Sequence, residues 1–542
     1  MGSATVEMDL VNGEISYFTE TTMVNGVKSK TKSAINGADE EVSAIEQRSS
    51  YEREWKFVEE TIKLINQKLS IMAQIKEKQI IRFSQPDQLK EEMDLSLDAD
   101  ECGRNLNELV GICESVIDRS VKSNNPFFFQ QLYHGVDPYG MAAAFLVEAL
   151  NTSTYTYDIG PVVSLMELEV VRIFCQLVGW KGGEGIFCPA ALGGSIANMY
   201  AVSLARFHFD ATTKAHGLSA RPRMMIYASD QSHYSVLKTA AFMGFGTESV
   251  VKVKTDSMGA MIPNELRKAI LDSRSSDQNC QPFMVWCTPG TTILNGFDPL
   301  EPIAEICNEF GLWMHADAAI GGAVLLSRKH RQLVQGIEMC DSVAWCWQKI
   351  LGAPFQTSLV LTRHKSLLKR AHCAHAEYLF AGKKHYDTHY DTGDWSIQCG
   401  RRPDAVKVWF MLKARGIDQI GRLVDTAFDM AKYMQEQLLA RSDRFRLVMS
   451  KAQATSVCFW VVPPSLAELA EDSDEYTEQL DAVAAVLKKR MVLRGAAMIL
   501  HQPISVKELP NFFRVTFGCH PLNTEDEVNQ LINLLVELSD DL

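Results

Sequence analysis

The chain has 542 residues, of which 46% are hydrophobic and 22% charged, and a net charge of −13. This composition excludes a wholly disordered chain, and the length predicts two or three domains rather than one core. The net negative charge disfavours a protein whose main function is to bind nucleic acid phosphates. An anionic substrate stays possible, because a buried site can carry a field opposite to the net charge.

The chain carries no sign of a membrane span or a signal peptide. No stretch approaches the ~18 apolar residues that a spanning helix needs, and the sequence after Met1 is polar and acidic. The thirteen cysteines form no CxxC pair, which disfavours a disulfide scaffold and a zinc ribbon. We expect a cytoplasmic protein with reduced cysteines and no metal, bound neither to a membrane nor to nucleic acid.

The N-terminal part divides into two segments. Residues 1–45 are rich in Thr, Ser, Asn, Gly and Glu and lack sustained periodicity, which predicts a disordered arm. Apolar residues then recur at helical spacing over 51–69 and again over 106–121. This pattern predicts a helical segment over 46–125.

From residue 185 onward, short apolar strands alternate with helices. The expected strands are 185–189, 223–229, 249–255, 283–288, 312–316, 342–345 and 358–362. The expected helices are 195–209, 232–243, 265–271 and 303–310. This alternation predicts an α/β domain over 126–415, with a mostly parallel sheet buried on both faces. Such sheets bind ligands at the carboxyl ends of their strands.

After residue 415 the pattern becomes that of a small α+β domain over 416–542. Its expected helices are 417–440, 475–493 and 525–538. Its expected strands are 445–449, 457–462, 497–501 and 512–517.

Polar residues follow several of the predicted strands. Gly194 and Ser195 open a helix whose free N–H groups suit a phosphate, although a serine-capped turn explains them as well. His233 can stack on an aromatic ligand or move a proton, or it can be incidental beside a helix start. Thr292 can donate to a ligand oxygen or simply form a turn.

Asp317 and Lys349 follow the next two strands. A carboxylate among small apolar residues needs a cation, which is either a salt-bridge partner in the core or a protonated pyridine nitrogen. An amine in apolar surroundings can act as a nucleophile, although most lysines are solvated. Taken together in this order, the residues match the phosphate, ring face, hydroxyl, nitrogen and aldehyde of pyridoxal 5′-phosphate.

Seven longer motifs resemble the group II pyridoxal-phosphate decarboxylases, the family that acts on glutamate, cysteine sulfinate, aspartate and dopa. They are NPFFF at 125–129, NMYA at 198–201, SDQSH at 229–233, HADAA at 315–319, YDTGD at 390–394, QCGRR at 398–402 and NFFR at 511–514. The last three resemble the acidic-amino-acid branch. The resemblance runs from about Glu52 to Leu542.

The resemblance implies fold type I of the pyridoxal-phosphate enzymes, which is aspartate aminotransferase-like, with a large mixed sheet domain and a small C-terminal domain. It implies a homodimer with active sites at the interface, where segment 46–125 helps to pack the subunits. It also implies that Lys349 binds the cofactor's aldehyde, that Asp317 pairs with its ring nitrogen, and that His233 stacks on its ring.

Further roles follow from the same resemblance. Thr292 would contact the hydroxyl edge of the ring, and Gly194 and Ser195 would hold the phosphate. Gly400 would reach the cofactor from the partner subunit. Tyr386, on a segment that is a mobile loop in the family, would protonate the carbon from which CO₂ has left.

Three residues would contact the substrate. By resemblance, Arg514 would hold a substrate carboxylate, and Gln131 occupies a position where the family contacts substrate. Gln348, directly before the lysine, resembles the insect aspartate 1-decarboxylase branch and is expected to contact both cofactor and substrate. Its carboxamide can donate to the second carboxylate or the sulfinate of a short acid.

Three features depart from the family pattern. Cys346, Trp347 and Gln348 stand where Asn-Pro-His usually precedes the lysine. Residues 190–192 separate Pro189 from the glycines, and Ile320 stands where an aromatic residue is common.

We therefore expect decarboxylation of a short acidic amino acid, namely L-aspartate to β-alanine, cysteine sulfinate to hypotaurine, or both. One alternative is a glutamate decarboxylase that makes GABA. An aldehyde synthase of the same fold is disfavoured by His233, because that branch carries Asn at this position. A catalytically silent dimeric paralogue is a further alternative, suggested by Cys346 and Trp347.

Overall fold

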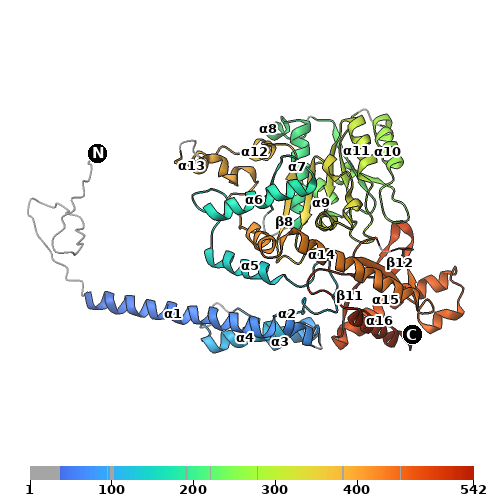
Figure 1. Cartoon of the computed structure of the whole chain (residues 1–542), viewed down its shortest axis with the longest axis horizontal. Helices are drawn as coiled ribbons and strands as arrows, with labels where there is room; N and C mark the ends of the chain where they lie inside the picture. Colours follow the sequence, from blue (N-terminus) through green and yellow to red (C-terminus); the bar gives the residue numbers. More distant parts are fainter. Residues whose placement is uncertain are drawn as a thin grey trace, which may run out of the picture.

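The computed structural model describes residues 37–542 except 78, 94, 98–102, 189–192, 220, 277–278, 381–383 and 452. The expected arm therefore lies outside the described residues up to residue 36, and from Gly37 the chain is part of helix α1 (Gly37–Lys68). Lys68 joins α1 to α4 (Leu106–Arg119) through ion pairs with Glu114 and Asp118. Together with α2 (Ile71–Lys76) and α3 (Pro86–Met93), these helices form the lower left part of Figure 1.

A seven-stranded sheet forms the centre of the chain, in the order β2-β8-β7-β6-β5-β3-β4. Its strands are β2 (Glu184–Phe187), β3 (Arg223–Ser229), β4 (Val250–Val253), β5 (Cys280–Cys287), β6 (Trp313–Asp317), β7 (Ser342–Cys346) and β8 (Ser358–Thr362). β8 runs antiparallel to both neighbours, and the other pairs are parallel. The predicted fold class is confirmed, and β3 and β8 have the predicted bounds.

Helices cover both faces of this sheet (Figure 1). Successive strand residues point to opposite faces, and accordingly Met225 and Tyr227 of β3 lie in one core cluster while Met224 and Ile226 lie in another. The first cluster is covered by α6 (Pro161–Val178), α10 (Pro263–Ser276) and α11 (Leu300–Phe310). The second is covered by α7 (Gly193–Phe209), α9 (Ser235–Phe242) and α12 (Leu367–His372).

Among the helices of this domain that were not predicted from the sequence, two precede β2. They are α5 (Pro138–Leu150) and α6, each of which begins with a proline at its first position. Apolar residues occupy most sides of both helices, and such a distribution hides the helical period. The short helices α8 (Thr213–His216) and α13 (Glu377–Phe380) complete the domain.

Helix α14 (Ala405–Leu439) connects the two domains and is broken at Gly416, which has φ 67° and ψ 164°. This positive φ requires a residue without a Cβ. The expected domain boundary at 415/416 falls at this break, and the expected helix 417–440 is the second part of α14.

A five-stranded sheet, in the order β1-β11-β12-β10-β9, forms the C-terminal domain. Its strands are β1 (Phe128–Phe129), β9 (Phe445–Leu447), β10 (Ser456–Val461), β11 (Met498–Ile504) and β12 (Leu509–Thr516). Helices α15 (Asp474–Arg494) and α16 (Glu525–Ser539) pack on it. β1 pairs in parallel with β11, so this sheet takes its edge strand from the start of the range predicted for the large domain, 126–415.

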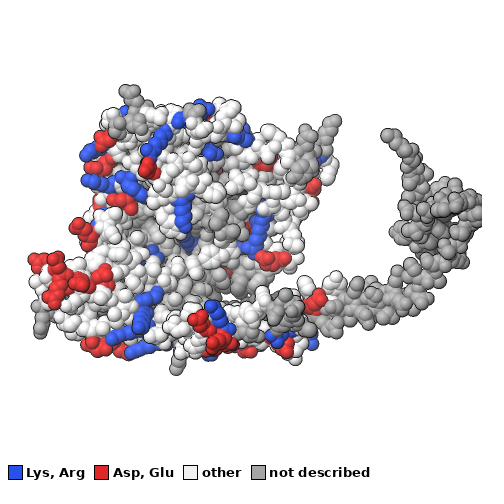
Figure 2. All heavy atoms as spheres, turned by 180° about the vertical axis from the view of Figure 1, so that it is seen from behind, with Lys and Arg blue, Asp and Glu red and all other residues white. Residues whose placement is uncertain are grey.

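The surface is mixed in charge. On the face drawn in Figure 2, acidic and basic side chains are interspersed and separated by uncharged surface. Among the helices of the described residues, none is both long enough and apolar enough to span a membrane.

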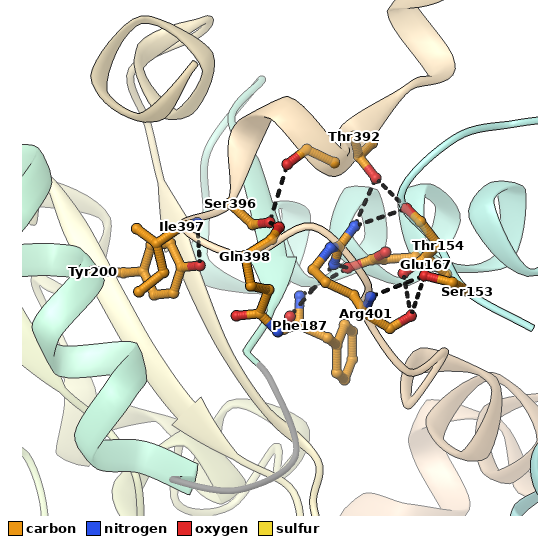
Figure 3. Close-up of polar contacts among 11 residues, drawn as sticks. Ser153, Thr154, Glu167, Phe187, Tyr200, Thr392, Ser396, Ile397, Gln398 and Arg401 are labelled. Atoms are coloured by element: carbon orange, nitrogen blue, oxygen red, sulfur yellow. Dashed lines mark hydrogen bonds and ion pairs between the residues drawn. The ribbon is translucent and has the colours of Figure 1, made fainter. Parts of the chain in front are cut away.

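A buried arginine joins three distant segments (Figure 3). Arg401 Nη1 lies 2.6 Å from Glu167 Oε1 on α6, and the two side chains are 1% and 3% exposed. Arg401 Nη2 donates to the Thr154 carbonyl and to Thr392 Oγ1. The Arg401 main-chain N–H donates to Ser153 Oγ, which in turn donates to the Arg401 carbonyl.

We expect Glu167→Gln to lower the free energy of unfolding by ~3–5 kcal/mol, because it leaves the buried Arg401 charge without compensation. Urea unfolding measures this loss. Glu169→Gln is the matched control on the same helix, since the Glu169–Arg172 pair is about half exposed and is expected to contribute ~0–1 kcal/mol. Equal losses in the two variants would contradict a stabilising role for the buried pair.

Candidate active site

A cavity of about 150 Å³ opens at the carboxyl edge of the parallel strands. Its walls come from segments that follow β3, β5, β6 and β7 and from the first turn of α7. Six of the predicted site residues line it, namely Gly194, Ser195, His233, Thr292, Asp317 and Lys349. Residues far apart in the sequence meet here because parallel strands end at one edge of the sheet.

Asp317 is the last residue of β6 and is 4% exposed. Its Oδ2 accepts a hydrogen bond from Asn198 Nδ2 at 2.8 Å, and its Oδ1 accepts one from the Ala319 N–H at 3.3 Å. Both donors are neutral, and Asp317 forms no ion pair within the described part of the chain. A buried carboxylate that is bonded only by neutral donors is stabilised by a cationic group in the cavity beside it.

Lys349 follows β7 and is partly buried against the cavity. The next residue, Ile350, has φ 60°, which is a strained conformation for a β-branched side chain. Its N–H donates to the Leu132 carbonyl at 3.2 Å, and its carbonyl accepts from the Cys519 N–H at 2.7 Å. These bonds hold the chain in a fixed direction directly after Lys349.

His233 follows β3, and its imidazole is held by local contacts. Its Nδ1 accepts a hydrogen bond from the Ser235 N–H at 3.2 Å, and its ring centroid lies 4.1 Å from that of Tyr234. Burial is the main cause that lowers the pKa of His233, and the nearby Lys349 lowers it further. A neutral imidazole suits the predicted stacking on an aromatic ring.

The first turn of α7 offers free N–H groups to the cavity. Gly193 has φ 53°, and a Cβ on Gly194 would lie 2.7 Å from Cys346 Sγ. The backbone can therefore come this close to the strand end only where side chains are absent. The insertion at 190–192 lies outside the described residues.

Gln348 lies at the boundary between this turn and a second cavity. Its Nε2 donates to Ser358 Oγ at 2.7 Å, and its Oε1 accepts from the Thr357 N–H at 3.2 Å. A Cβ on Gly193 would lie 3.6 Å from Gln348 Nε2. The amide thus lies beside the predicted phosphate site, while the residue also lines the second cavity.

The other two departures before Lys349 have neutral partners. Ser358 Oγ donates to Cys346 Sγ at 3.2 Å, and burial is the main cause that raises the pKa of the Cys346 thiol. The Trp347 ring stacks on Phe174 with centroids 5.0 Å apart. Ile320, the third departure, lines the first cavity.

Arg514 on β12 is a buried cation without a carboxylate partner among the described residues. It is 2% exposed, its Nε has no hydrogen-bond partner, and burial is the main cause that lowers its pKa. Its Nη1 donates to the carbonyl of Thr292, which lines the first cavity. Arg514 lines neither cavity itself, and the bond to Thr292 joins its charge to the wall of the first.

The second cavity has a volume of about 440 Å³ and is lined by Gln131, His134, Phe355 and Gln348, among others. Burial lowers the pKa of His134 to about 4, and the Arg514 charge contributes to this shift. Arg514 therefore influences groups of both cavities.

Tyr386 and Gly400 do not line either cavity. The Tyr386 hydroxyl donates to Asp391 Oδ1 at 2.9 Å and accepts from Lys384 Nζ at 2.8 Å. Gly400 is exposed beside Ser153. The roles predicted for both residues remain predictions.

Asn198 is a site residue to which the sequence analysis gave no role. It lines the first cavity and bonds Asp317. It lies four residues after Gly194 on the same helix, and residues at this spacing share a helix face. That spacing, and its place at the start of the NMYA motif, were the signals that could have identified it.

The residues of the first cavity fit pyridoxal 5′-phosphate. Asp317 is a buried carboxylate without a cation, the glycines of α7 leave space that a Cβ would fill, and Lys349 supplies an amine. His233 lies where a ring face would lie, and burial lowers its pKa. This donor set suits one nitrogen heterocycle that carries a phosphate and an aldehyde.

Comparison with known proteins gives the same result. The sequence matches the family described as "Pyridoxal-dependent decarboxylase conserved domain" over residues 86–462. It is 46% identical to human cysteine sulfinic acid decarboxylase over 464 residues, covering 85% of this chain and 92% of that protein. It is 43% identical to mouse acidic amino acid decarboxylase GADL1 over 472 residues, covering 87% and 84%.

Solved structures of decarboxylases have a similar fold. A crystal structure of mouse CSAD superposes with a TM-score of 0.84 at 42% identity, covering 90% of this chain and 98% of that one. A tryptophan decarboxylase from Catharanthus roseus, at 22% identity and a TM-score of 0.74, covers 92% and 98% and shares the fold.

We expect Gly194→Ala to weaken binding of pyridoxal 5′-phosphate about ten-fold, because the new methyl group overpacks against Cys346 Sγ. Titration of the purified protein, followed by the visible absorption of the bound cofactor, measures the change. Cys346→Ala in the Gly194→Ala background should restore part of the affinity, with Cys346→Ala alone as the control. No recovery in the double variant would contradict this contact as the cause.

Proposed function

The chain belongs to the pyridoxal-dependent decarboxylase family, and from this premise we propose that it decarboxylates a short acidic amino acid. The substrates are cysteine sulfinate, L-aspartate or both, and the products are CO₂ with hypotaurine or β-alanine. Two kinds of relative support this choice, since their names refer to cysteine sulfinic acid and to acidic amino acids.

The observation that carries the proposal is the buried Arg514 guanidinium. It is 2% exposed, has an unpartnered Nε and donates to the carbonyl of the cavity residue Thr292. An arginine can form two parallel hydrogen bonds to a carboxylate or a sulfinate. We assign to it the acidic group of the substrate that does not leave as CO₂.

Pyridoxal 5′-phosphate, when bound, supplies an aldehyde for the substrate amine and a ring that accepts the electron pair left by CO₂. The amine of Lys349 would hold the aldehyde, and the first turn of α7 would hold the phosphate. Asp317 would keep the ring nitrogen protonated. His233, whose pKa is lowered by burial, would stack on the face of the ring.

The carbon that loses CO₂ must then receive a proton, and Tyr386 is the proposed donor. Its hydroxyl is bonded to Asp391 and Lys384 and does not line the cavity of its own chain. The role therefore requires either movement of this segment or its contribution to the site of a second copy.

A homodimer is part of the proposal. Apolar side chains are exposed on helices of the N-terminal half, among them Trp55 (63%) on α1, Leu150 (51%) on α5 and Val162 (61%) on α6. Apolar surface of this extent is typical of an interface between subunits. In such a dimer Gly400 would reach the cofactor site of the partner subunit.

We also propose a cytoplasmic location. Each of the twelve cysteines that the structure describes is a free thiol. Free thiols in this number suit a reducing compartment.

We expect Lys349→Ala to abolish CO₂ release, because the chain then presents no amine to the cofactor's aldehyde. The assay measures labelled CO₂ released from carboxyl-labelled substrate. Aspartate, cysteine sulfinate and glutamate are each offered separately. Lys329→Ala, at a surface lysine 62% exposed, is the control. Release above a few per cent in Lys349→Ala, or none in the wild type with any of the three, would contradict the proposal.

We expect Arg514→Lys to raise KM for aspartate and cysteine sulfinate alike and to lower kcat/KM by roughly ten- to hundred-fold. Lysine keeps the charge but loses the two-pronged geometry. The visible absorption of the bound cofactor should be unchanged, which separates a substrate role from a cofactor role. Unchanged kcat/KM for both substrates, or a loss explained by lost cofactor, would contradict the assignment.

A further inference from the structure

A chain of buried hydrogen bonds leads from Asp317 away from the cavity. Asp317 Oδ2 accepts from Asn198 Nδ2 at 2.8 Å, and Asn198 Oδ1 lies 3.0 Å from His315 Nε2. On the other side of the imidazole, His315 Nδ1 lies 2.9 Å from Ser342 Oγ. Ser342 Oγ also lies 2.9 Å from Trp313 Nε1. All five residues are at most 5% exposed.

The direction of the bonds can be derived from the carboxylate end. An ionised carboxylate only accepts hydrogen bonds, so the amide nitrogen of Asn198 faces Asp317. The second N–H of this amide is directed at Ser235 Oγ, 3.3 Å away. The amide oxygen of Asn198 therefore faces His315, and His315 Nε2 must carry the hydrogen.

The contacts at the tryptophan end are compatible with the same direction. An indole N–H only donates, so Ser342 Oγ accepts from Trp313. Ser342 can then donate its single hydroxyl hydrogen to His315 Nδ1, which is an acceptor when a neutral ring carries its hydrogen on Nε2. Both ends of the chain are compatible with one neutral tautomer of His315, with hydrogen on Nε2 alone.

The surroundings of His315 support a neutral ring. Burial lowers the pKa of His315 to about 4, although the Asp317 charge acts in the opposite direction. The edge of the imidazole meets the Trp286 ring, with centroids 5.2 Å apart and planes at 88°. At neutral pH the imidazole of His315 thus carries one N–H hydrogen, and the hydrogen bond to Asn198 Oδ1 locates it on Nε2.

We propose that His315 and Ser342, which do not line the cavity, are positioning residues for Asp317 and hold its carboxylate ionised toward the ring nitrogen of the cofactor. Each donor in the chain points toward Asp317, so the bonds polarise one another in the same direction. A neutral Asp317 would have to reverse or lose this arrangement. The inference rests on the proposed role of Asp317, and it does not depend on which acidic amino acid is the substrate.

The test compares the natural cofactor with an analogue in which carbon replaces the ring nitrogen. The holoenzyme is incubated with increasing concentrations of this deaza analogue of pyridoxal phosphate, and the displaced natural cofactor is measured. The resulting exchange constant reports only the contribution of the ring nitrogen. A substitution that loosens the whole site lowers the affinity for both ligands equally and leaves the exchange constant unchanged.

We expect His315→Phe to shift the exchange constant about ten-fold toward the analogue, because it removes the donor that fixes the Asn198 amide. His315→Gln, which keeps an N–H for Asn198, and Ser342→Ala, which frees Nδ1, should give smaller shifts in the same direction. His372→Phe is the matched control and should leave the constant unchanged. His372 is a half-buried histidine that also has two hydrogen-bond partners, Ser203 and the Trp395 carbonyl.

The same measurement on Asp317→Asn separates two kinds of failure. An unchanged exchange constant in Asp317→Asn would overturn the pairing of Asp317 with the ring nitrogen. A shift in Asp317→Asn together with none in any His315 or Ser342 variant would overturn the positioning role. His315→Gln and Ser342→Ala keep the test decisive where His315→Phe does not fold.

Discussion

The buried ion pair between Arg401 and Glu167 joins parts of the chain that no strand pairing connects (Figure 3). It fixes α6 against the segment that leads into α14. Phe174 of the same helix stacks on Trp347, two residues before the cavity lysine Lys349. The orientation of the strand end that carries Lys349 therefore depends on α6. The position of α6 in turn depends on a buried ion pair, in which the loss of one partner would leave the other charge uncompensated.

Charges buried elsewhere in the chain show where a ligand is expected. Arg401 and Glu167 neutralise one another, whereas Asp317 receives hydrogen bonds from neutral donors. Arg514 has no carboxylate partner in the part of the chain that the structure describes. Unpaired buried charges are costly unless something compensates them. Asp317 lines the first cavity, and Arg514 bonds a residue of its wall. A ligand there that carries one cationic and one anionic group would compensate both buried charges.

The sequence predicted the large sheet well, because its strands are short apolar runs between polar turns. α5 and α6 were missed, because apolar residues on most of their sides conceal the helical period. The residues that follow strands were found because parallel topology brings them to one edge. Six of these line one cavity.

The hydrogen-bond chain behind Asp317 could be anticipated only in part. His315 precedes Asp317 by two residues, which puts both on one face of β6. Its contact with Ser342 depends on the strand register, in which these two residues are partners. A register between strands separated by many residues is set by the packed core, and no local pattern in this sequence encodes it. The same limit applies to Gln348, whose partners Thr357 and Ser358 come from the start of β8.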